Sequence, residues 1–303
     1  MNFFKKRPYL QFVSPAVVLY TTFMIVPILF AVYMSFHDWS GIGPMKFIGF
    51  GNFVKLLTDP RISKIFLNAL GNNLKFTVCV LTIILTVQLV FAYLLHIKIR
   101  GSKYFQLVIF LPYVISTAII GFFTLIVFDP NLGILNNLLG LLGRTDLKSA
   151  WFGNPKISFA LLVMVILWQS VGAGMMIFYA NMKDIPRSVI EASVIDGAGE
   201  WTRFTRIVMP LLAPSFTTNI ILGVIWSLTI FDIPFLIGGP QGGINNSIDF
   251  ANQFFYRSSF GSAYFGETSL GFGASISVVM FLIIFSVSMI LSKLLKRFKS
   301  NDD

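Results

Sequence analysis

Charged side chains are scarce in this sequence. Asp, Glu, Lys and Arg make up 12% of its 303 residues, whereas hydrophobic residues make up 55% and the mean hydropathy is +0.78. A soluble domain needs charge at about a quarter of its positions, because its surface faces water. Much of this surface must therefore face lipid. The apolar runs are continuous rather than alternating, which predicts an all-α membrane protein rather than a closed barrel.

Cysteine and histidine are nearly absent as well. Cys79 is the single cysteine, and the two histidines, His37 and His96, stand apart from each other. An intrachain disulfide and a thiolate metal cluster are thereby excluded. We expect these three residues to serve packing or an interface, and we expect no metal site. No cluster of His, Asp and Glu suggests a membrane-embedded enzyme, so we predict no catalytic residue.

The sequence also contains no Gly-x-x-x-x-Gly-Lys-Ser/Thr loop for binding phosphates, so the chain cannot hydrolyse ATP alone. Its net charge of +10 could suggest a nucleic-acid partner. The Lys and Arg residues, however, cluster beside apolar runs, as at 5–7 and 293–299, which is typical of contact with anionic lipid headgroups. We expect membrane lipid, and no nucleic acid, as the partner of these clusters.

Six long runs nearly free of charge predict six transmembrane helices. Each exceeds the roughly 20 residues that a helix needs to cross the hydrocarbon core. The first is too long for a secretory signal peptide and lacks a small-residue cleavage site, so we expect it to remain. Residues 53–66 show helical spacing of apolar side chains, which predicts a short amphipathic helix on the outer surface. We interpret residues 1–303 as one membrane domain with spans at about 10–36, 74–97, 104–128, 157–182, 214–237 and 270–294.

The distribution of Lys and Arg orients these helices. With the N-terminus inside, fourteen of the 23 basic residues fall in cytoplasmic segments, which are normally the richer in Lys and Arg. We therefore predict that both termini and the segment 183–213 lie in the cytoplasm.

The segment 183–213, between the fourth and fifth spans, departs from the apolar pattern. Pro186 suits the first turn of a helix, where its missing N–H costs nothing, and Gly197 suits the end of one, because glycine adopts positive φ freely. Small and apolar residues between them suit close docking. The segment holds a spaced series: Glu191, Ala192, Ser193, Asp196, Gly197, Ala198, Phe204, Ile207, Pro210 and Pro214.

This series resembles the EAA loop of permease subunits in binding-protein-dependent ABC importers. The pattern of that loop is Glu-Ala-Ala, then Asp-Gly-Ala, a Phe, an Ile, Leu-Pro and a later Pro. Ser193 replaces the second Ala and Met209 the Leu before Pro, and both keep a small or apolar side chain. Nearly the whole chain shares the resemblance, which points to the carbohydrate (maltose/oligosaccharide-like) branch through residues 12–39 and 49–53, Leu111-Pro112 and residues 231–240.

The resemblance implies a type I ABC importer permease in a bacterial cytoplasmic membrane, with a coupling helix over about residues 185–198. That helix would insert into a cleft of a separate ATPase dimer, whose ATP-driven closure would move it together with spans four and five. The other implied partners are a second, homologous permease that completes a heterodimer, an external solute-binding protein, and a sugar, with an oligosaccharide preferred. The chain itself would be no enzyme and would bind no cofactor, since ATP and Mg belong to the ATPase.

Polar and aromatic residues in spans four and five are candidates for the solute path. Asp232 is the sole acidic residue in its apolar run, where a carboxylate normally faces a cavity or a partner. In one interpretation Asp232 accepts hydrogen bonds from sugar hydroxyls or acts as a gate residue, and Trp226 and Phe231 supply apolar ring faces. In the other, Asp232 lies at a helix end near the outer interface and bonds to backbone groups or to the partner subunit. Gln169 and Asn219 either contact cargo or form interhelical hydrogen bonds.

Two alternative functions stay open at this point. The permease could carry another solute, such as a polyol or glycerol phosphate. The chain could instead be a secondary carrier driven by an ion gradient, although such carriers use inverted repeats and several intramembrane ionisable residues, and Asp232 stands alone.

Overall fold

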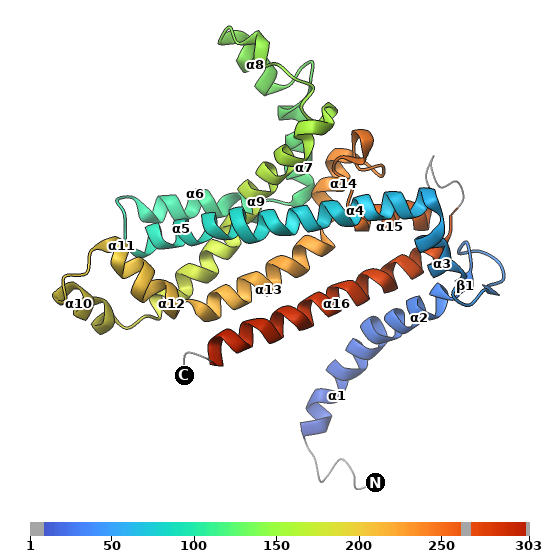
Figure 1. The fold of residues 1–303 in the computed structure, drawn as a ribbon, viewed down its shortest axis with the longest axis horizontal. Coiled ribbons are helices and arrows are strands. Elements are labelled where there is room, and N and C mark those ends of the chain that lie inside the picture. The colour runs from blue at the N-terminus through green and yellow to red at the C-terminus, as the bar shows by residue number, and fades with distance from the viewer. Residues whose placement is uncertain (1–8, 262–267, 301–303) are drawn as a thin grey trace. The chain divides into compact units, whose positions relative to one another are not determined.

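Helices make up almost all regular structure in the computed structural model, which describes residues 9–261 and 268–300 (Figure 1). The contacts within the chain divide it into two compact units. The first comprises residues 1–64 and 255–283, and the second comprises residues 65–254 and 284–303.

The first unit begins with an apolar helix that changes its winding midway. α1 (Tyr9–Tyr20) passes through a π-helical turn (Thr21–Ile25) into α2 (Val26–Ser35). The π turn directly precedes Pro27, whose ring and missing N–H disfavour a regular α-helical bond at that place. None of the most apolar 18-residue window of this helix is buried.

A short hairpin follows this helix. β1 (His37–Asp38) pairs antiparallel with β2 (Lys46–Phe47), and α3 (Gly51–Thr58) comes next. The buried amide of Asn52 donates to the carbonyl oxygens of Ser35 at 3.0 Å and His37 at 2.9 Å, which satisfies acceptors left over at the end of α2. α16 (Leu270–Ser300) starts beside this hairpin, where the Gly271 N–H donates to the Trp39 carbonyl at 3.1 Å.

The second unit is built around α9 (Pro155–Lys183), which packs against α5 (Leu85–His96) and α6 (Ser102–Val114). Two glycines permit this contact: a Cβ at Gly172 would lie 2.9 Å from backbone atoms of Ile109 and Phe110, and a Cβ at Gly174 would collide with Gln88. In lipid there is no hydrophobic driving force for helices to associate, so close van der Waals packing at small residues holds them together.

Buried asparagines fasten the helix that precedes α5. α4 (Pro60–Cys79) continues through a π turn (Val80–Ile84) into α5, which gives one helix of 37 residues. The Asn72 amide donates to the Asp249 carbonyl at 2.9 Å. The Asn73 amide donates to the Ser227 carbonyl at 2.8 Å, while its oxygen accepts the Ala251 N–H at 2.9 Å. A buried amide without partners is costly, so these bonds fix α4 to the segment 246–251 and to Ser227, in the helix Ala213–Thr229.

The remaining helices of this unit are shorter or interrupted. They include α7 (Thr117–Val127), α8 (Ile134–Leu141), α13 (Ala213–Thr229), α14 (Asp232–Gly238) and α15 (Ala251–Phe260), whose last residues belong to the first unit, and three short helices within residues 187–211. Between α7 and α8 the Asp129 carboxylate accepts the N–H groups of Asn131 and Leu132, both at 2.8 Å. These two bonds lower the pKa of Asp129 and stabilise the turn that connects the two helices.

The described part of the chain contains five helices long and apolar enough to cross a membrane, namely Phe12–Ser35, Pro60–His96, Pro155–Lys183, Ala213–Gly238 and Leu270–Leu295. A sixth span exists if α6 and α7, bent by 96° at their junction, are taken as one. If α6 and α7 are counted as one span, the structure agrees with the prediction of six spans. It does not agree with one continuous helix over residues 104–128, because the chain bends between these two helices.

The helix that contains the second span is longer than the predicted span. It begins at Pro60, so that Arg61, Lys64 and the asparagines belong to α4, whereas the start of the membrane span itself near residue 74 stays a prediction. The expected separate amphipathic helix over 53–66 is therefore divided between α3 and the first turns of α4. The cytoplasmic position of the termini stays a prediction.

Candidate functional site: the interhelical segment and a polar cavity

The segment 183–213 folds into a short helix with a defined end. α10 (Arg187–Ile195) starts after Pro186, which is its N-cap rather than part of its first turn. At the other end the Ala198 N–H donates to the Ser193 carbonyl at 2.9 Å and the Gly197 N–H to the Val194 carbonyl at 3.1 Å. This pair of bonds is a Schellman motif, and Gly197 occupies its left-handed position with φ of +75°.

α10 presents most of the predicted coupling residues outwards. Glu191, Ala192, Asp196 and Gly197 are exposed, and Ser193 is buried with its hydroxyl bonded to the Ile190 carbonyl at 2.6 Å. Large apolar side chains beside them are exposed too: Ile195 by 85% and Trp201 by 75%. Exposed apolar side chains gathered at one place on a surface mark an interaction site. We call the face formed by Ala192, Val194, Ile195, Gly197 and Trp201 the docking face.

The second half of the segment is anchored to the helix bundle. α11 (Glu200–Arg203) is followed by a π turn (Phe204–Val208) and by α12 (Met209–Leu211). Phe204, predicted from the sequence, lies against the ring of Tyr93 in α5 with 4.4 Å between ring centroids. Val208 is buried, Ile207 is half-buried and Pro210 is exposed. The predicted residues are therefore divided between an outward docking face and an inward anchor.

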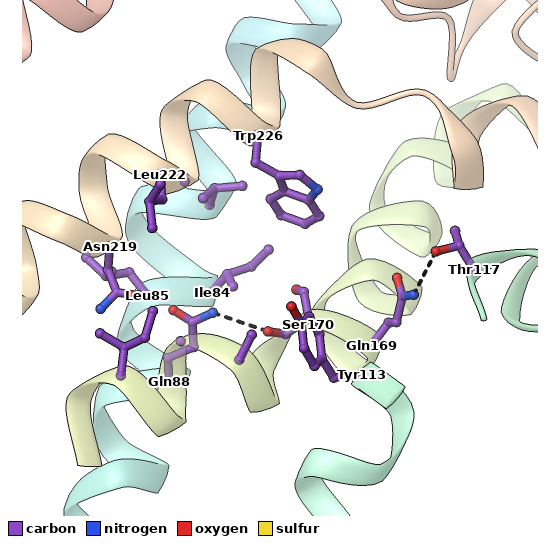
Figure 2. Close-up of a pocket in the computed structure, with 15 residues that line it drawn as sticks. Ile84, Leu85, Gln88, Tyr113, Thr117, Gln169, Ser170, Asn219, Leu222 and Trp226 are labelled. Atoms are coloured by element: carbon purple, nitrogen blue, oxygen red, sulfur yellow. Dashed lines mark hydrogen bonds between the residues drawn. The ribbon is translucent and has the colours of Figure 1, made fainter. Parts of the chain in front are cut away.

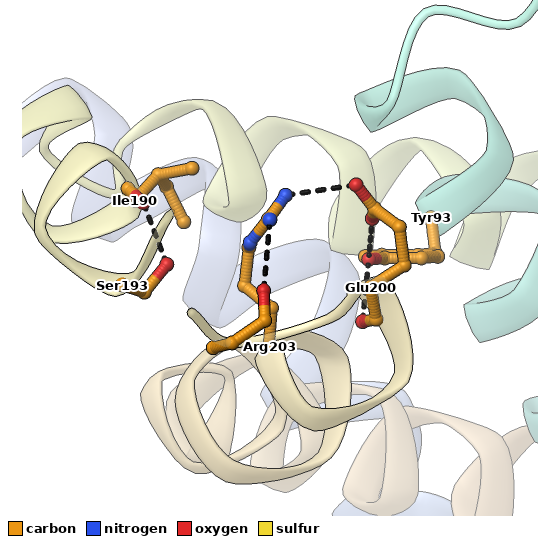
Figure 3. A network of polar contacts seen from close by, with 6 residues as sticks. Tyr93, Ile190, Ser193, Glu200 and Arg203 are labelled. Carbon is orange, nitrogen blue, oxygen red and sulfur yellow. Dashed lines mark hydrogen bonds and ion pairs between the residues drawn. The ribbon is translucent and has the colours of Figure 1, made fainter. Parts of the chain in front are cut away.

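Polar contacts between α11 and α5 reinforce the anchor (Figure 3). The Tyr93 hydroxyl donates to Glu200 Oε2 at 2.9 Å, and Arg203 Nη1 forms an ion pair with Glu200 Oε1 at 2.8 Å. Arg203 Nη2 also donates to the Ala198 carbonyl at 3.2 Å, beside the end of α10. The network thus links the Schellman turn to α5. None of these three side chains was predicted from the sequence, although Glu200 and Arg203 stand at the i, i+3 spacing of a helical ion pair.

A cavity of about 570 Å³ opens in the second unit between the α4–α5 helix, α6, α7, α9 and α13. Figure 2 shows Trp226 from α13 and the amide of Gln169 from α9 projecting towards the same space. We call it the central cavity. Its polar and aromatic lining consists of Gln88, Tyr113, Thr117, Gln169, Ser170, Asn219 and Trp226.

Three of the five residues predicted for the solute path line the central cavity: Gln169, Asn219 and Trp226. Gln169 donates to Thr117 at 3.4 Å, which is an interhelical bond, whereas Asn219 donates to Ser215 within its own helix at 3.0 Å. Gln88, Tyr113, Thr117 and Ser170 were not anticipated, because no local sequence pattern marks them and only the packing brings them together.

Phe231 and Asp232 line a second, smaller cavity of about 270 Å³. Thr117, Gln169 and Trp226 line both cavities, so these three side chains stand between them. Asp232 is exposed and is the first residue of α14, after a break in which Ile230 is extended with ψ of 136°. Its carboxylate therefore lies at a helix start rather than in the middle of an apolar helix.

The chain matches the sequence profile of the family described as binding-protein-dependent transport system inner membrane component over residues 84–300. It is 31% identical over 292 residues to the probable ABC transporter permease protein YurN of Bacillus subtilis (strain 168), an alignment covering 95% of this chain and 96% of the relative. It is also 31% identical over 280 residues to the lactose transport system permease protein LacF of Rhizobium radiobacter, covering 92% and 91%.

A solved structure shares the fold. It is a chain of a bacterial alginate ABC transporter in complex with alginate pentasaccharide-bound periplasmic protein, which matches with a TM-score of 0.82 at 19% identity and covers 98% of both chains. This likeness confirms the predicted type I importer permease fold. The sequence match extends over most of the chain and establishes the family to which the chain belongs. The protein belongs to the family of inner-membrane components of binding-protein-dependent transport systems.

Proposed function

We propose that this chain is a permease subunit of an ATP-driven uptake system for sugars, in which it forms half of the translocation pore. The observation that carries the proposal is α10, a short capped helix with an exposed apolar face, held between two membrane-spanning helices by a polar anchor. A rigid element of this kind can pass a displacement into the spans on either side, which repack between two states. A secondary carrier has no use for such a face, and the family membership also favours the importer.

The driving partner in this proposal is a separate ATPase dimer that holds ATP and Mg and receives the docking face in a cleft. The sequence of this chain contains no phosphate-binding loop of its own. A second, homologous permease would supply the other half of the pore, and an external solute-binding protein would deliver the cargo. The periplasmic protein bound to the structural relative and the family description both support that last partner.

The lining of the central cavity suits a neutral sugar. Amide and hydroxyl groups can hydrogen-bond sugar hydroxyls, and the Trp226 ring offers an apolar face for a sugar ring. Among the described residues that line the two cavities there is one charged side chain, Asp232, and it is acidic. A glycerol phosphate would place its negative charge here without a cation to receive it. We therefore favour a neutral sugar over glycerol phosphate, and the lactose relative supports an oligosaccharide.

Association and uptake together test the proposal. Affinity purification of the full chain from a bacterial membrane should recover an ATPase and a second multi-span protein in near-equal amounts. Cells lacking the chain should lose uptake of one labelled oligosaccharide from a panel that also includes monosaccharides, a polyol and glycerol phosphate. Purification of the chain alone would refute the importer proposal, and loss of only the polyol or the glycerol phosphate would refute the choice of sugar.

The cytoplasmic position of α10 needs a separate test. Ser193 is buried, so a labelling cysteine belongs at the exposed Val194, with Cys79 first replaced by Ser. We expect an impermeant thiol reagent to label this variant in inside-out vesicles stripped of ATPase and not in intact cells. A cysteine at Leu141, which is 87% exposed in α8, serves as the outer control. Labelling of Val194→Cys on intact cells would contradict the mechanism.

A further inference from the structure

A second pocket in the second unit is lined by basic side chains and does not belong to the pore. It has a volume of about 530 Å³ and lies where the C-terminal ends of α5 and α9 meet the start of α10. Its lining includes Lys98, Lys183 and Arg187, against a single carboxylate, Glu191. We call it the basic pocket.

Charge in the basic pocket is unbalanced. Among the described residues, none of its three cations takes part in a recorded ion pair, and the Lys183 ammonium instead lies 4.3 Å from the centre of the Tyr179 ring. All three cationic side chains are exposed, so their charged ends are accessible. The floor beneath them is apolar: Met182 is fully buried, and Ile185 and Ile190 are half-buried. A ring of accessible cations over an apolar floor is complementary to an anionic amphiphile.

The backbone conformation of Lys98 is independent evidence that its side chain serves a function. Lys98 has a φ of +55°, in the left-handed region that favours glycine. The Lys98 N–H donates to the Leu95 carbonyl at 3.2 Å and the Ile99 N–H to the Leu94 carbonyl at 3.5 Å, so Lys98 occupies the glycine position of a Schellman motif at the end of α5. A lysine is a costly residue for capping a helix in this way, and strained residues concentrate where a side chain serves a function.

We propose that the basic pocket binds the headgroup of an anionic phospholipid, with the phosphate among Lys98, Lys183 and Arg187 and the upper acyl chain over Met182. Both helices that end at the pocket are long and apolar enough to cross a membrane, and Lys98 and Lys183 stand at or just beyond their ends, where phospholipid headgroups are expected. The bound lipid would hold the start of α10 against α5 and α9. The inference goes beyond the proposed transport function and holds whichever solute is carried, because it needs only that these helix ends meet a membrane surface.

Lipid binding to the full chain, purified with its partners in a non-ionic detergent, tests the proposal. Native mass spectrometry would count phosphatidylglycerol and, separately, phosphatidylcholine bound to the wild type. The pocket variant combines Lys98→Gly, Lys183→Gln and Arg187→Gln. The control combines Arg100→Gln, Lys103→Gln and Arg206→Gln, which removes equal charge from exposed residues that do not line the pocket.

We expect the wild type to prefer phosphatidylglycerol and the pocket variant to lose on the order of 100-fold in affinity for it, about fivefold for each cation removed. The control should bind as the wild type does. Lys98→Gly alone should weaken binding about fivefold while relieving the strained end of α5, so that its effect cannot be ascribed to misfolding.

Equal binding by pocket variant and control would overturn the proposal. Displacement of phosphatidylglycerol by millimolar inorganic phosphate would also overturn it and identify a site for free phosphate. Unchanged lipid binding together with loss of the ATPase would show that the pocket belongs to the protein interface instead. Lipid binding is measured here without transport, so its failure and a failure of the uptake proposal are separate results.

Discussion

Replacing Gly197 by Leu should uncouple the docking face while leaving the membrane helices folded. Gly197 has a φ of +75°, where a residue with a Cβ costs about 1–2 kcal/mol. No atom of the chain lies within 4 Å of a Cβ built at this position, so steric collision within the chain adds nothing. The strain alone lowers the equilibrium constant for forming the capped turn roughly 5- to 30-fold. If docking requires the capped turn, uptake should fall by up to the same factor.

Three further variants separate strain from bulk in this experiment. Gly197→Asn should keep most uptake, because Asn adopts the left-handed conformation at lower cost. Gly199→Leu adds the same bulk to a residue with φ of −66°, and should also keep it. Gly101→Leu adds the same strain at the start of α6, where φ is +81° and the added Cβ meets open space, so it should lower stability but not coupling.

The assay measures labelled sugar uptake in cells and ATPase stimulation in vesicles, each corrected for the amount of chain in the membrane. Normal uptake and normal ATPase stimulation in Gly197→Leu would refute the coupling role of the turn. An equal loss in Gly199→Leu would instead mean that bulk at the docking face, and not the strained cap, is what matters.

Three more outcomes are expected. Gly172→Ala should destabilise the purified chain by about 1–3 kcal/mol in thermal unfolding, because its Cβ would meet backbone atoms at 2.9 Å, whereas Gly71→Ala, with open space around it, should be neutral or slightly stabilising. Tyr93→Phe should reduce uptake by up to about fivefold, since it removes one hydrogen bond to a carboxylate that is largely exposed, and adding Glu200→Gln should reduce it little further. Asp232→Ala should change apparent sugar affinity more than the yield of co-purified subunits; a changed yield with unchanged affinity would assign Asp232 a structural role.

The sequence predicted the spans whose apolar character is uninterrupted. α9 and α16 begin within two residues of the predicted starts, because charge-poor runs of this length have few structural alternatives. The bend between α6 and α7 was not predictable in the same way. It lies at Ile115-Ser116, without a glycine or proline at the break itself, and Pro112 four residues before Ser116 was no more than a general hint.

The early start of α4 was missed for a different reason. Asn72 and Asn73 look like loop residues when their partners are unknown, and those partners are backbone groups more than 150 positions away. In the candidate site, too, features set by local sequence were predicted and features set by tertiary packing were not. The end of α10 at Gly197 follows from local chemistry and was predicted, whereas Tyr93 is joined to Glu200 by tertiary packing that no local pattern encodes.

The asparagine bonds of α4 have a consequence for motion. Asn72 and Asn73 hold the segment 246–251 through two buried hydrogen bonds, and Asn73 holds Ser227 of α13 through a third. Separating α4 from that segment would therefore expose several polar groups together. Any tilt of the α4 portion that bears them must then carry that segment with it. During a transport cycle this part of α4 and the segment 246–251 should therefore move as one rigid body. Structural change should be concentrated at helix contacts that lack such hydrogen bonds.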